Sequence, residues 1–130
     1  MVDTSMKILL VDDFSTMRKI IKNLLRKLGY QDVHEAENGE VALEMLKSDN
    51  FNFIIADWNM PKMGGLDLLK TIREDEKYKD TPFMMVTSEA NKDNIFNAVE
   101  AGADDYIVKP FNADILKEKL ETILNQLGKT

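Results

Sequence analysis

Short apolar runs alternate with amphipathic segments along the whole chain, and this alternation constrains the fold more than any other feature. Four runs are almost wholly apolar, and a weaker run also contains polar residues. They occupy residues 8–11, 53–56, 83–86 and 106–108, with the weaker run at 33–36. An uninterrupted apolar run is typical of a strand that is covered on both faces, as in a parallel sheet. We therefore expect five parallel strands.

The segments between these runs carry apolar residues at helical spacing. The first helix is expected over residues 17–28, with Ser15 as its N-cap and Gly29 at its end. Four further helices are expected over residues 41–46 after Asn38, over 66–73, from 92 to 101 before Gly102, and over 116–127 before Gly128.

Five strand–helix units fill the 130 residues without a linker, a repeat or a low-complexity stretch. Crossovers between parallel strands are right-handed, which places helices on both faces of the sheet. The pattern therefore predicts an α/β fold, a doubly wound (βα)5 three-layer sandwich. One domain is the usual expectation at this length, and we assign residues 1–130 to a single domain.

Composition and charge exclude several functional classes. The 17 basic and 23 acidic residues give a formal net charge of −6, which disfavours nucleic acid as a partner. Because the chain has no cysteine and one histidine, we exclude disulfides, cysteine-ligated zinc and any site that needs two imidazoles. It shows no signal-peptide pattern and no apolar segment of membrane length, so we expect a soluble cytoplasmic protein.

The remaining charged residues have ordinary interpretations. His34 lies in a polar stretch without a second ligand nearby, and we interpret it as exposed. The first helix is basic, which on an acidic protein is more typical of a solvated helix face than of a nucleic-acid surface. Its basic residues are Arg18, Lys19, Lys22, Arg26 and Lys27.

Polar residues follow four of the apolar runs, at the point where each strand is expected to end. These residues are Asp12, Asp13, Asp57, Thr87 and Lys109. Taken singly, each is an ordinary turn or cap residue. Ligands of open α/β sheets bind beyond the carboxyl ends of the strands, so we expect the five side chains to meet at one edge.

Three carboxylates at one edge repel one another, and only a few changes relieve that repulsion. Two carboxylates about 4 Å apart repel each other by about 4 kcal/mol at an effective dielectric constant of about 20. Such a cluster either raises a pKa or binds a cation. Oxygen donors without histidine or cysteine select a hard ion, usually Mg²⁺ in cells. With Lys109 and the Thr87 hydroxyl the site fits a phosphate, and one carboxylate could accept a phosphoryl group as a nucleophile.

Residues 11–18 and 57–61, together with Thr87 and the Lys109-Pro110 pair, resemble the receiver domain of bacterial two-component response regulators. The match is particularly close to the single-domain regulators of chemotaxis and covers residues 7–127, about the whole chain. It implies a flavodoxin-like fold with strand order 2-1-3-4-5 and no output domain. It also implies a cis peptide bond between Lys109 and Pro110.

The resemblance implies roles for the acidic edge. Asp57 would accept a phosphoryl group from a phosphohistidine on a sensor kinase of the CheA type, so the protein would signal and would not be an enzyme. Asp13, Asp57 and the backbone carbonyl of Asn59 would bind Mg²⁺, and Asp12 would act mainly through water.

The resemblance also implies a switch. Lys109 would pair with the phosphoryl oxygens, and Thr87 would donate a hydrogen bond to one of them. As Thr87 moves, Tyr106 would turn inward and alter the surface formed by the fourth helix, the last strand and the last helix. Side chains at Asn59 and Glu89 would tune the lifetime of the acyl phosphate.

The fourth helix carries a wider apolar arc than one core stripe needs, which leaves an edge for a partner. By resemblance that partner is a flagellar motor switch protein of the FliM type. A dedicated phosphatase is a further expected partner, and the protein is expected to be a monomer without nucleic-acid or membrane contacts. The expected surface consists of Ile95, Val99, Ala103, Tyr106, Val108 and Lys119.

Two positions depart from the family pattern. Gly64 stands where the family usually has Asp or Asn, which makes the loop more permissive in its backbone angles. Ser88 stands where the family often has Ala, and it is still small enough to leave access to Asp57.

Three alternative functions share part of this pattern. A flavodoxin-like FMN carrier would need a hydroxyl- and glycine-rich loop after the first strand, where Asp12 and Asp13 would repel the FMN phosphate. A metal-dependent aspartyl phosphatase would need a D-x-D motif, which Asp12-Asp13-Phe14 does not supply. Within the family, a phosphorelay shuttle or a phosphate sink remains the alternative to motor signalling.

Overall fold

The computed structural model describes residues 5–88 and 92–126. Within these residues five strands alternate with five helices, as the sequence pattern predicts. Their order is β1 (Ile8–Val11), α1 (Ser15–Lys27), β2 (Val33–Ala36), α2 (Gly39–Ser48), β3 (Phe53–Asp57), α3 (Gly65–Arg73), β4 (Phe83–Thr87), α4 (Lys92–Glu100), β5 (Asp105–Val108) and α5 (Ala113–Gln126). Gly128, the expected end of the last helix, lies outside the described residues. No helix in the described ranges is long and apolar enough to cross a membrane.

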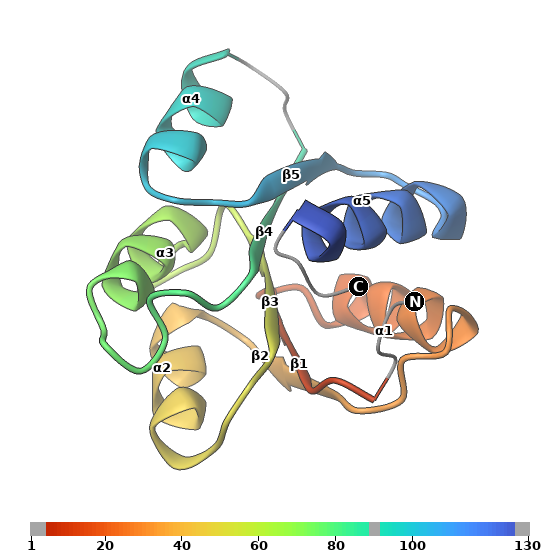
Figure 1. The fold of residues 1–130 in the computed structure, drawn as a ribbon, viewed down its shortest axis with the longest axis horizontal. Coiled ribbons are helices and arrows are strands. Elements are labelled where there is room, and N and C mark those ends of the chain that lie inside the picture. The colour runs from red at the N-terminus through yellow and green to blue at the C-terminus, as the bar shows by residue number, and fades with distance from the viewer. Residues whose placement is uncertain (1–4, 89–91, 127–130) are drawn as a thin grey trace.

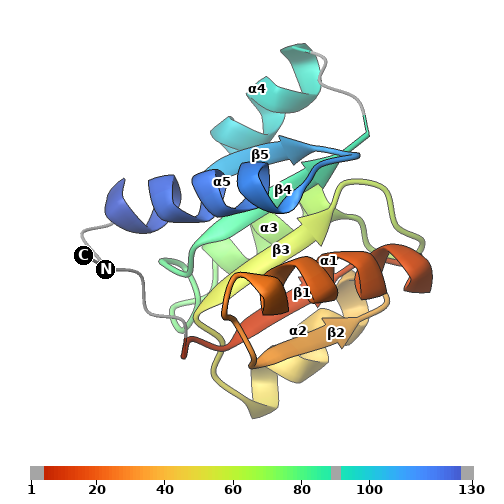
Figure 2. The same cartoon turned by 90° about the vertical axis from the view of Figure 1, so that its right-hand side faces the viewer.

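The strands form one parallel sheet in the order β2-β1-β3-β4-β5. Figure 1 shows α1 and α5 on one face of this sheet and α2, α3 and α4 on the other. In the view of Figure 2, α1 and α5 lie side by side across their face. The doubly wound three-layer fold and the flavodoxin-like strand order are therefore confirmed.

Each face of the sheet has its own hydrophobic cluster. Successive side chains of a strand point to opposite faces. In β1, Ile8 and Leu10 pack toward α1 and α5, whereas Leu9 and Val11 pack toward α2 and α3. All four side chains are fully buried. Because helices cover both faces, no position of a central strand faces water, which explains the uninterrupted apolar runs.

Some of the helix caps are those that the sequence predicts, and one is not. Gly29 and Gly102 have φ angles of 102° and 103°, in the left-handed region that favours glycine at the end of a helix. Asn38 caps α2, because its Oδ1 accepts a backbone hydrogen bond of 3.0 Å from the first turn. The expected cap of α1 is wrong: Ser15 is already helical, and Phe14 occupies the N-cap position without a side-chain hydrogen bond.

The turn from β3 to α3 returns tightly onto the end of β3. A Cβ atom on Gly65 would lie 2.3 Å from the carbonyl oxygen of Asp57 and 2.7 Å from Sδ of Met85. Gly64 is the N-cap of α3 with a φ of −81°, so the backbone freedom expected at this position is not used. The positive φ of this turn belongs instead to Lys62, at 66°. Glycine at position 65 therefore allows α3 to begin directly against the strand that carries Asp57.

We predict that Gly65→Ala lowers the free energy of unfolding by about 2 kcal/mol, the cost of overpacking a filled site. In an open helix position the same change stabilises by up to about 1 kcal/mol, so close packing reverses the usual sign. Urea denaturation measures the difference. The control is Lys70→Ala, an exposed position of the same helix, which should change stability by less than about 0.5 kcal/mol. Equal stability of Gly65→Ala and the unaltered chain would contradict the close approach.

Candidate functional site

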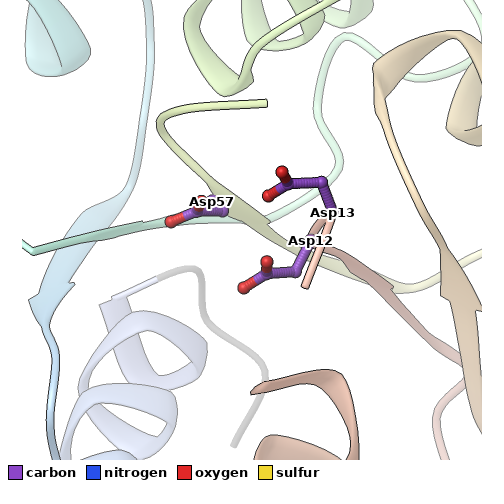
Figure 3. Close-up of side chains that lie close together, drawn as sticks. All are labelled: Asp12, Asp13 and Asp57. Carbon is purple, nitrogen blue, oxygen red and sulfur yellow. The ribbon is translucent and has the colours of Figure 1, made fainter. Parts of the chain in front are cut away.

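The carboxyl ends of β1 and β3 bring three aspartates together, as the sequence predicts. Asp12, Asp13 and Asp57 each place one carboxylate oxygen within 4.8 Å of the other two. Figure 3 shows the first two side chains at the end of β1 and the third at the end of β3. Asp12 and Asp57 are buried, with exposed fractions of 1% and 6%, whereas Asp13 is exposed. The cluster is therefore largely desolvated but open to solvent at Asp13.

The sheet fixes the backbone of this cluster. The ladder of hydrogen bonds continues past β1, where Asp12 N donates to the carbonyl of Ala36 at 3.1 Å. It also continues past β3, where Trp58 N donates to the carbonyl of Val86 at 2.8 Å. Asp12 and Asp57 therefore stand on backbone that is held by neighbouring strands rather than on free loops.

Lys109 supplies the cation of the site. Its Nζ lies 3.1 Å from Oδ1 of Asp57 and 3.8 Å from Oδ2 of Asp12. Its backbone N donates to the carbonyl of Thr87 at 2.9 Å, which ties the turn after β5 to the end of β4. The peptide bond between Lys109 and Pro110 is cis, as expected. Thr87 itself is buried at the end of β4.

Burial dominates the electrostatics of the two inner aspartates. It raises the pKa of Asp57, and the hydrogen bond from Lys109 offsets this only in part. It also raises the pKa of Asp12, against the hydrogen bond from the Phe14 amide and the charge of Lys109. The negative charge of neighbouring aspartates raises both pKa values further. Ionisation of either carboxylate in the folded chain therefore costs free energy that a further cation would offset.

The residues present fit a hard metal ion. Oδ1 of Asp12 accepts a hydrogen bond of 2.9 Å from the Phe14 amide. Oδ2 of the same carboxylate is buried and accepts none, and it is the only such side-chain atom among the described residues. A buried acceptor without a donor is costly. With carboxylate oxygens as the donors on offer, the cluster can bind a cation of the Mg²⁺ or Ca²⁺ class.

The two residues expected to tune the acyl phosphate have different outcomes. Asn59 lies exposed in the turn after β3, two residues beyond Asp57, where its side chain is accessible from solvent. Glu89 lies outside the described residues. Both roles stay predictions.

The two expected switch residues face one small cavity. Thr87 and Tyr106 line it together with Trp58 and Ile95, and its volume is about 10 Å³. Tyr106 is partly buried in β5, and Nζ of Lys119 lies 4.8 Å from the centroid of its ring. The cavity therefore gives Thr87 a direct structural neighbour in Tyr106.

The apolar edge of α4 differs from the expected one. Val99 is exposed by 59%, as predicted, but Ile95 and Ala103 are only partly exposed. Phe96, which was not among the residues expected at this surface, is exposed by 62% and lies one helical turn before Val99. Apolar spacing alone did not show which side of the wide arc faces the sheet. The other expected surface residues, all partly exposed, are Tyr106, Val108 and Lys119.

Comparisons with known proteins identify relatives in both sequence and fold. The family model described as the response regulator receiver domain matches residues 8–121. The chain is 57% identical over 123 residues to the chemotaxis protein CheY of Pseudomonas aeruginosa, covering 95% of this chain and 99% of that protein. It is 56% identical over 123 residues to CheY-3 of Vibrio cholerae, covering 95% of each.

Solved structures agree with these relatives. The chemotaxis response regulator CheY4 of Vibrio cholerae superposes with a TM-score of 0.86 at 35% identity, covering 92% of this chain and 99% of that one. The receiver domain of a Pseudomonas aeruginosa sensor histidine kinase superposes with a TM-score of 0.84 at 28% identity, covering 93% of this chain and 98% of that one. That structure is described with a magnesium ion coordinated in its active-site cleft.

We predict that Asp57→Asn stabilises the metal-free protein at pH 7. The pKa of Asp57 is raised in the folded state, so the folded chain binds a proton more tightly than the unfolded chain does. The ionised carboxylate therefore destabilises the fold above this pKa. The excess stability of Asp57→Asn should shrink as the pH is lowered through the raised pKa toward about 4, the unfolded value. Urea denaturation in the presence of a chelator, at several pH values, measures the difference in the free energy of unfolding between Asp57→Asn and the unaltered chain.

Glu118→Gln is the control for this profile, because it also removes one negative charge but at an exposed position of α5. We expect its stability to follow that of the unaltered chain within about 0.5 kcal/mol at every pH. If Asp57→Asn showed the same pH dependence as Glu118→Gln, the desolvation of Asp57 would be refuted.

Proposed function

This chain belongs to the response regulator receiver domain family, and on that basis we propose that Asp57 accepts a phosphoryl group from a phosphohistidine of a sensor kinase. The observation that carries the proposal is the pairing of Asp57 Oδ1 with Lys109 Nζ at 3.1 Å, beside two further carboxylates. Phosphoryl transfer requires positioning and charge neutralisation more than covalent help. A buried carboxylate between a fixed ammonium and a cation site meets both requirements.

In the proposed transfer, a carboxylate oxygen of Asp57 attacks the phosphorus of the donor. A P–O bond forms while the P–N bond to the donor imidazole breaks, and its electron pair returns to the imidazole nitrogen. The imidazole, already protonated on its other nitrogen, leaves as neutral histidine. Lys109 Nζ then pairs with the oxygens of the new acyl phosphate from the place where it now contacts Asp57.

The proposed cofactor is Mg²⁺, held by Asp12, Asp13, Asp57 and the backbone carbonyl of Asn59. When bound, the ion offsets the negative charge that the phosphoryl group adds to an already acidic cluster. Two observations support this choice: the buried Oδ2 of Asp12 lacks a donor, and a receiver-domain relative is described with magnesium in its cleft.

We propose a signalling role without enzymatic turnover of a separate substrate. Asp57 is itself modified by the transfer, and water later attacks the acyl phosphate and restores the carboxylate and free phosphate. We propose that the exposed Asn59 side chain, two residues after Asp57, influences that hydrolysis, with Glu89 as its counterpart after β4.

The proposed output is phosphorylation-dependent binding of a flagellar motor switch protein of the FliM type. Thr87 would move toward the phosphoryl group, and Tyr106 would turn into the cavity that the two residues share. This change would alter the surface of α4, β5 and α5, where Phe96 and Val99 present exposed apolar side chains. Relatives named as chemotaxis proteins support a motor output, and a CheA-type kinase is the proposed donor.

We predict that Trp58 fluorescence reports two separate events. Trp58 follows Asp57 directly and lines the cavity of Thr87, so both metal binding and phosphorylation should change its surroundings. Addition of Mg²⁺ should produce a first change, and a small acyl-phosphate donor should then produce a second. Asp57→Asn should abolish the second change, because the amide cannot form the acyl phosphate.

The control is the donor added to the unaltered chain in a chelator, which should produce neither change. Mass spectrometry of the same samples should show one added phosphoryl group in the unaltered chain with Mg²⁺ and none in Asp57→Asn. A phosphorylated Asp57→Asn variant would refute the acceptor assignment.

We predict that Val99→Asp weakens binding of the phosphorylated chain to a FliM-type switch peptide by about tenfold, the loss of one buried apolar contact. Val99 is 59% exposed, so the change should leave the fold intact. Ile20→Asp is the matched control, because Ile20 is an exposed apolar residue of α1 on the other face of the sheet. Fluorescence titration with labelled peptide measures both affinities.

Phosphorylation itself should tighten binding of the switch peptide to the unaltered chain. Equal affinity before and after phosphorylation would contradict the motor output and favour a phosphorelay shuttle or a phosphate sink. Equal weakening by Val99→Asp and Ile20→Asp would place the contact elsewhere.

A further inference from the structure

Arg18 contacts the acidic edge, although its place in a basic helix suggested a solvated side chain. Its Nη1 donates a hydrogen bond of 2.6 Å to the backbone carbonyl of Asp12, and its Nε donates one of 3.0 Å to Oε1 of Glu35. The side chain is only 17% exposed. One guanidinium therefore links three elements: α1, the turn after β1, and β2.

The Glu35 end of this link is a fixed anion. Lys22, one helical turn after Arg18, places its Nζ 3.2 Å from the second oxygen of Glu35. Although burial acts to raise the pKa of Glu35, the hydrogen bonds from Lys22 and Arg18 lower it overall. Glu35 therefore stays ionised at neutral pH and holds the guanidinium in one orientation.

The Asp12 end of the link fixes a peptide plane. Asp12 N already donates to Ala36 in the sheet, but β1 ends at Val11 and the Asp12 carbonyl lies past the regular ladder. Arg18 supplies the donor for that carbonyl. The same peptide joins Asp12 to Asp13, so its orientation determines where the exposed Asp13 carboxylate points relative to the buried one.

We propose that Arg18 is a positioning residue for the acidic cluster: by bridging the Asp12 carbonyl to Glu35, it orients the Asp12–Asp13 peptide so that both carboxylates face one cation. This inference rests on the proposed Mg²⁺ site but not on phosphorylation. Arg18 acts through two directed hydrogen bonds, which a planar guanidinium can make simultaneously and a single ammonium cannot.

The test compares three variants by Mg²⁺ titration of Trp58 fluorescence. Arg18→Lys keeps the positive charge but loses the bridge, and it should weaken Mg²⁺ affinity on the order of tenfold, as outer-shell changes do at metal sites. Lys22→Gln is the matched control on the same helix and the same glutamate, without contact to Asp12, and it should stay within about twofold of the unaltered chain. Glu35→Gln should fall between them, since its amide oxygen still accepts from Arg18.

A second readout uses the metal-free protein. Amide hydrogen exchange at Asp13 and Phe14 should be faster in Arg18→Lys than in Lys22→Gln, whereas exchange within β3 should be equal in both. Equal exchange within β3 shows that the variant is folded, so a local change is separated from general destabilisation.

Unchanged Mg²⁺ affinity in Arg18→Lys, or an equal loss in Lys22→Gln, would overturn the proposal and leave Arg18 as a structural ion pair. The phosphoryl acceptor is tested separately by Asp57→Asn. If that variant were still phosphorylated, the proposed function would fail while the Mg²⁺ titrations would continue to decide the role of Arg18.

Discussion

Three carboxylates that share one partly buried edge are the costly arrangement on which the rest of this structure depends. Burial raises the pKa of Asp12 and Asp57, and repulsion from the neighbouring aspartates acts in the same direction. Lys109 offsets part of this cost through its contact with Asp57, but Oδ2 of Asp12 still lacks a hydrogen bond. The negative charge of the cluster is therefore only partly offset, and its carboxylate oxygens can bind a cation. In the proposed transfer, a bound cation would offset the negative charge that the phosphoryl group adds to this cluster.

The surrounding fold holds these like charges together. The sheet ladder extends past β1 and fixes Asp12, and the bare Cα of Gly65 lets α3 close against the carbonyl of Asp57. Arg18 reaches the same edge from α1 and is anchored on Glu35. None of these contacts removes a carboxylate charge. They fix the backbone, so that the side chains cannot separate to relieve their repulsion.

The sequence was sufficient for the features that repeat or that meet at one edge. Helices cover both faces of the central strands, so each strand appears as an apolar run, and parallel strands bring Asp12, Asp57 and Thr87 to the same side. Features that depend on which way a side chain points could not be predicted from the sequence. The apolar arc of α4 did not show that Phe96 faces solvent, and the basic first helix did not show that Arg18 faces Glu35. The wrong cap at Ser15 and the unused freedom of Gly64 have the same cause, because residue type permits a backbone angle without requiring it.

The β4–β5 pairing places the two proposed switch residues, Thr87 and Tyr106, close together between the acidic edge and α4. Thr87 pairs with Val108, and Met85 pairs with Tyr106. Side chains two residues apart on a strand share a face, so Thr87 and Tyr106 are diagonal neighbours on the α4 side of the sheet. The sheet itself is close-packed and does not deform easily. In the proposed switch, Tyr106 would therefore turn into the small cavity that both side chains line as Thr87 moves toward the phosphoryl group. Because Ile95 of α4 lines that same cavity, the two proposed switch residues lie directly beneath α4, the helix that also carries the exposed Phe96 and Val99.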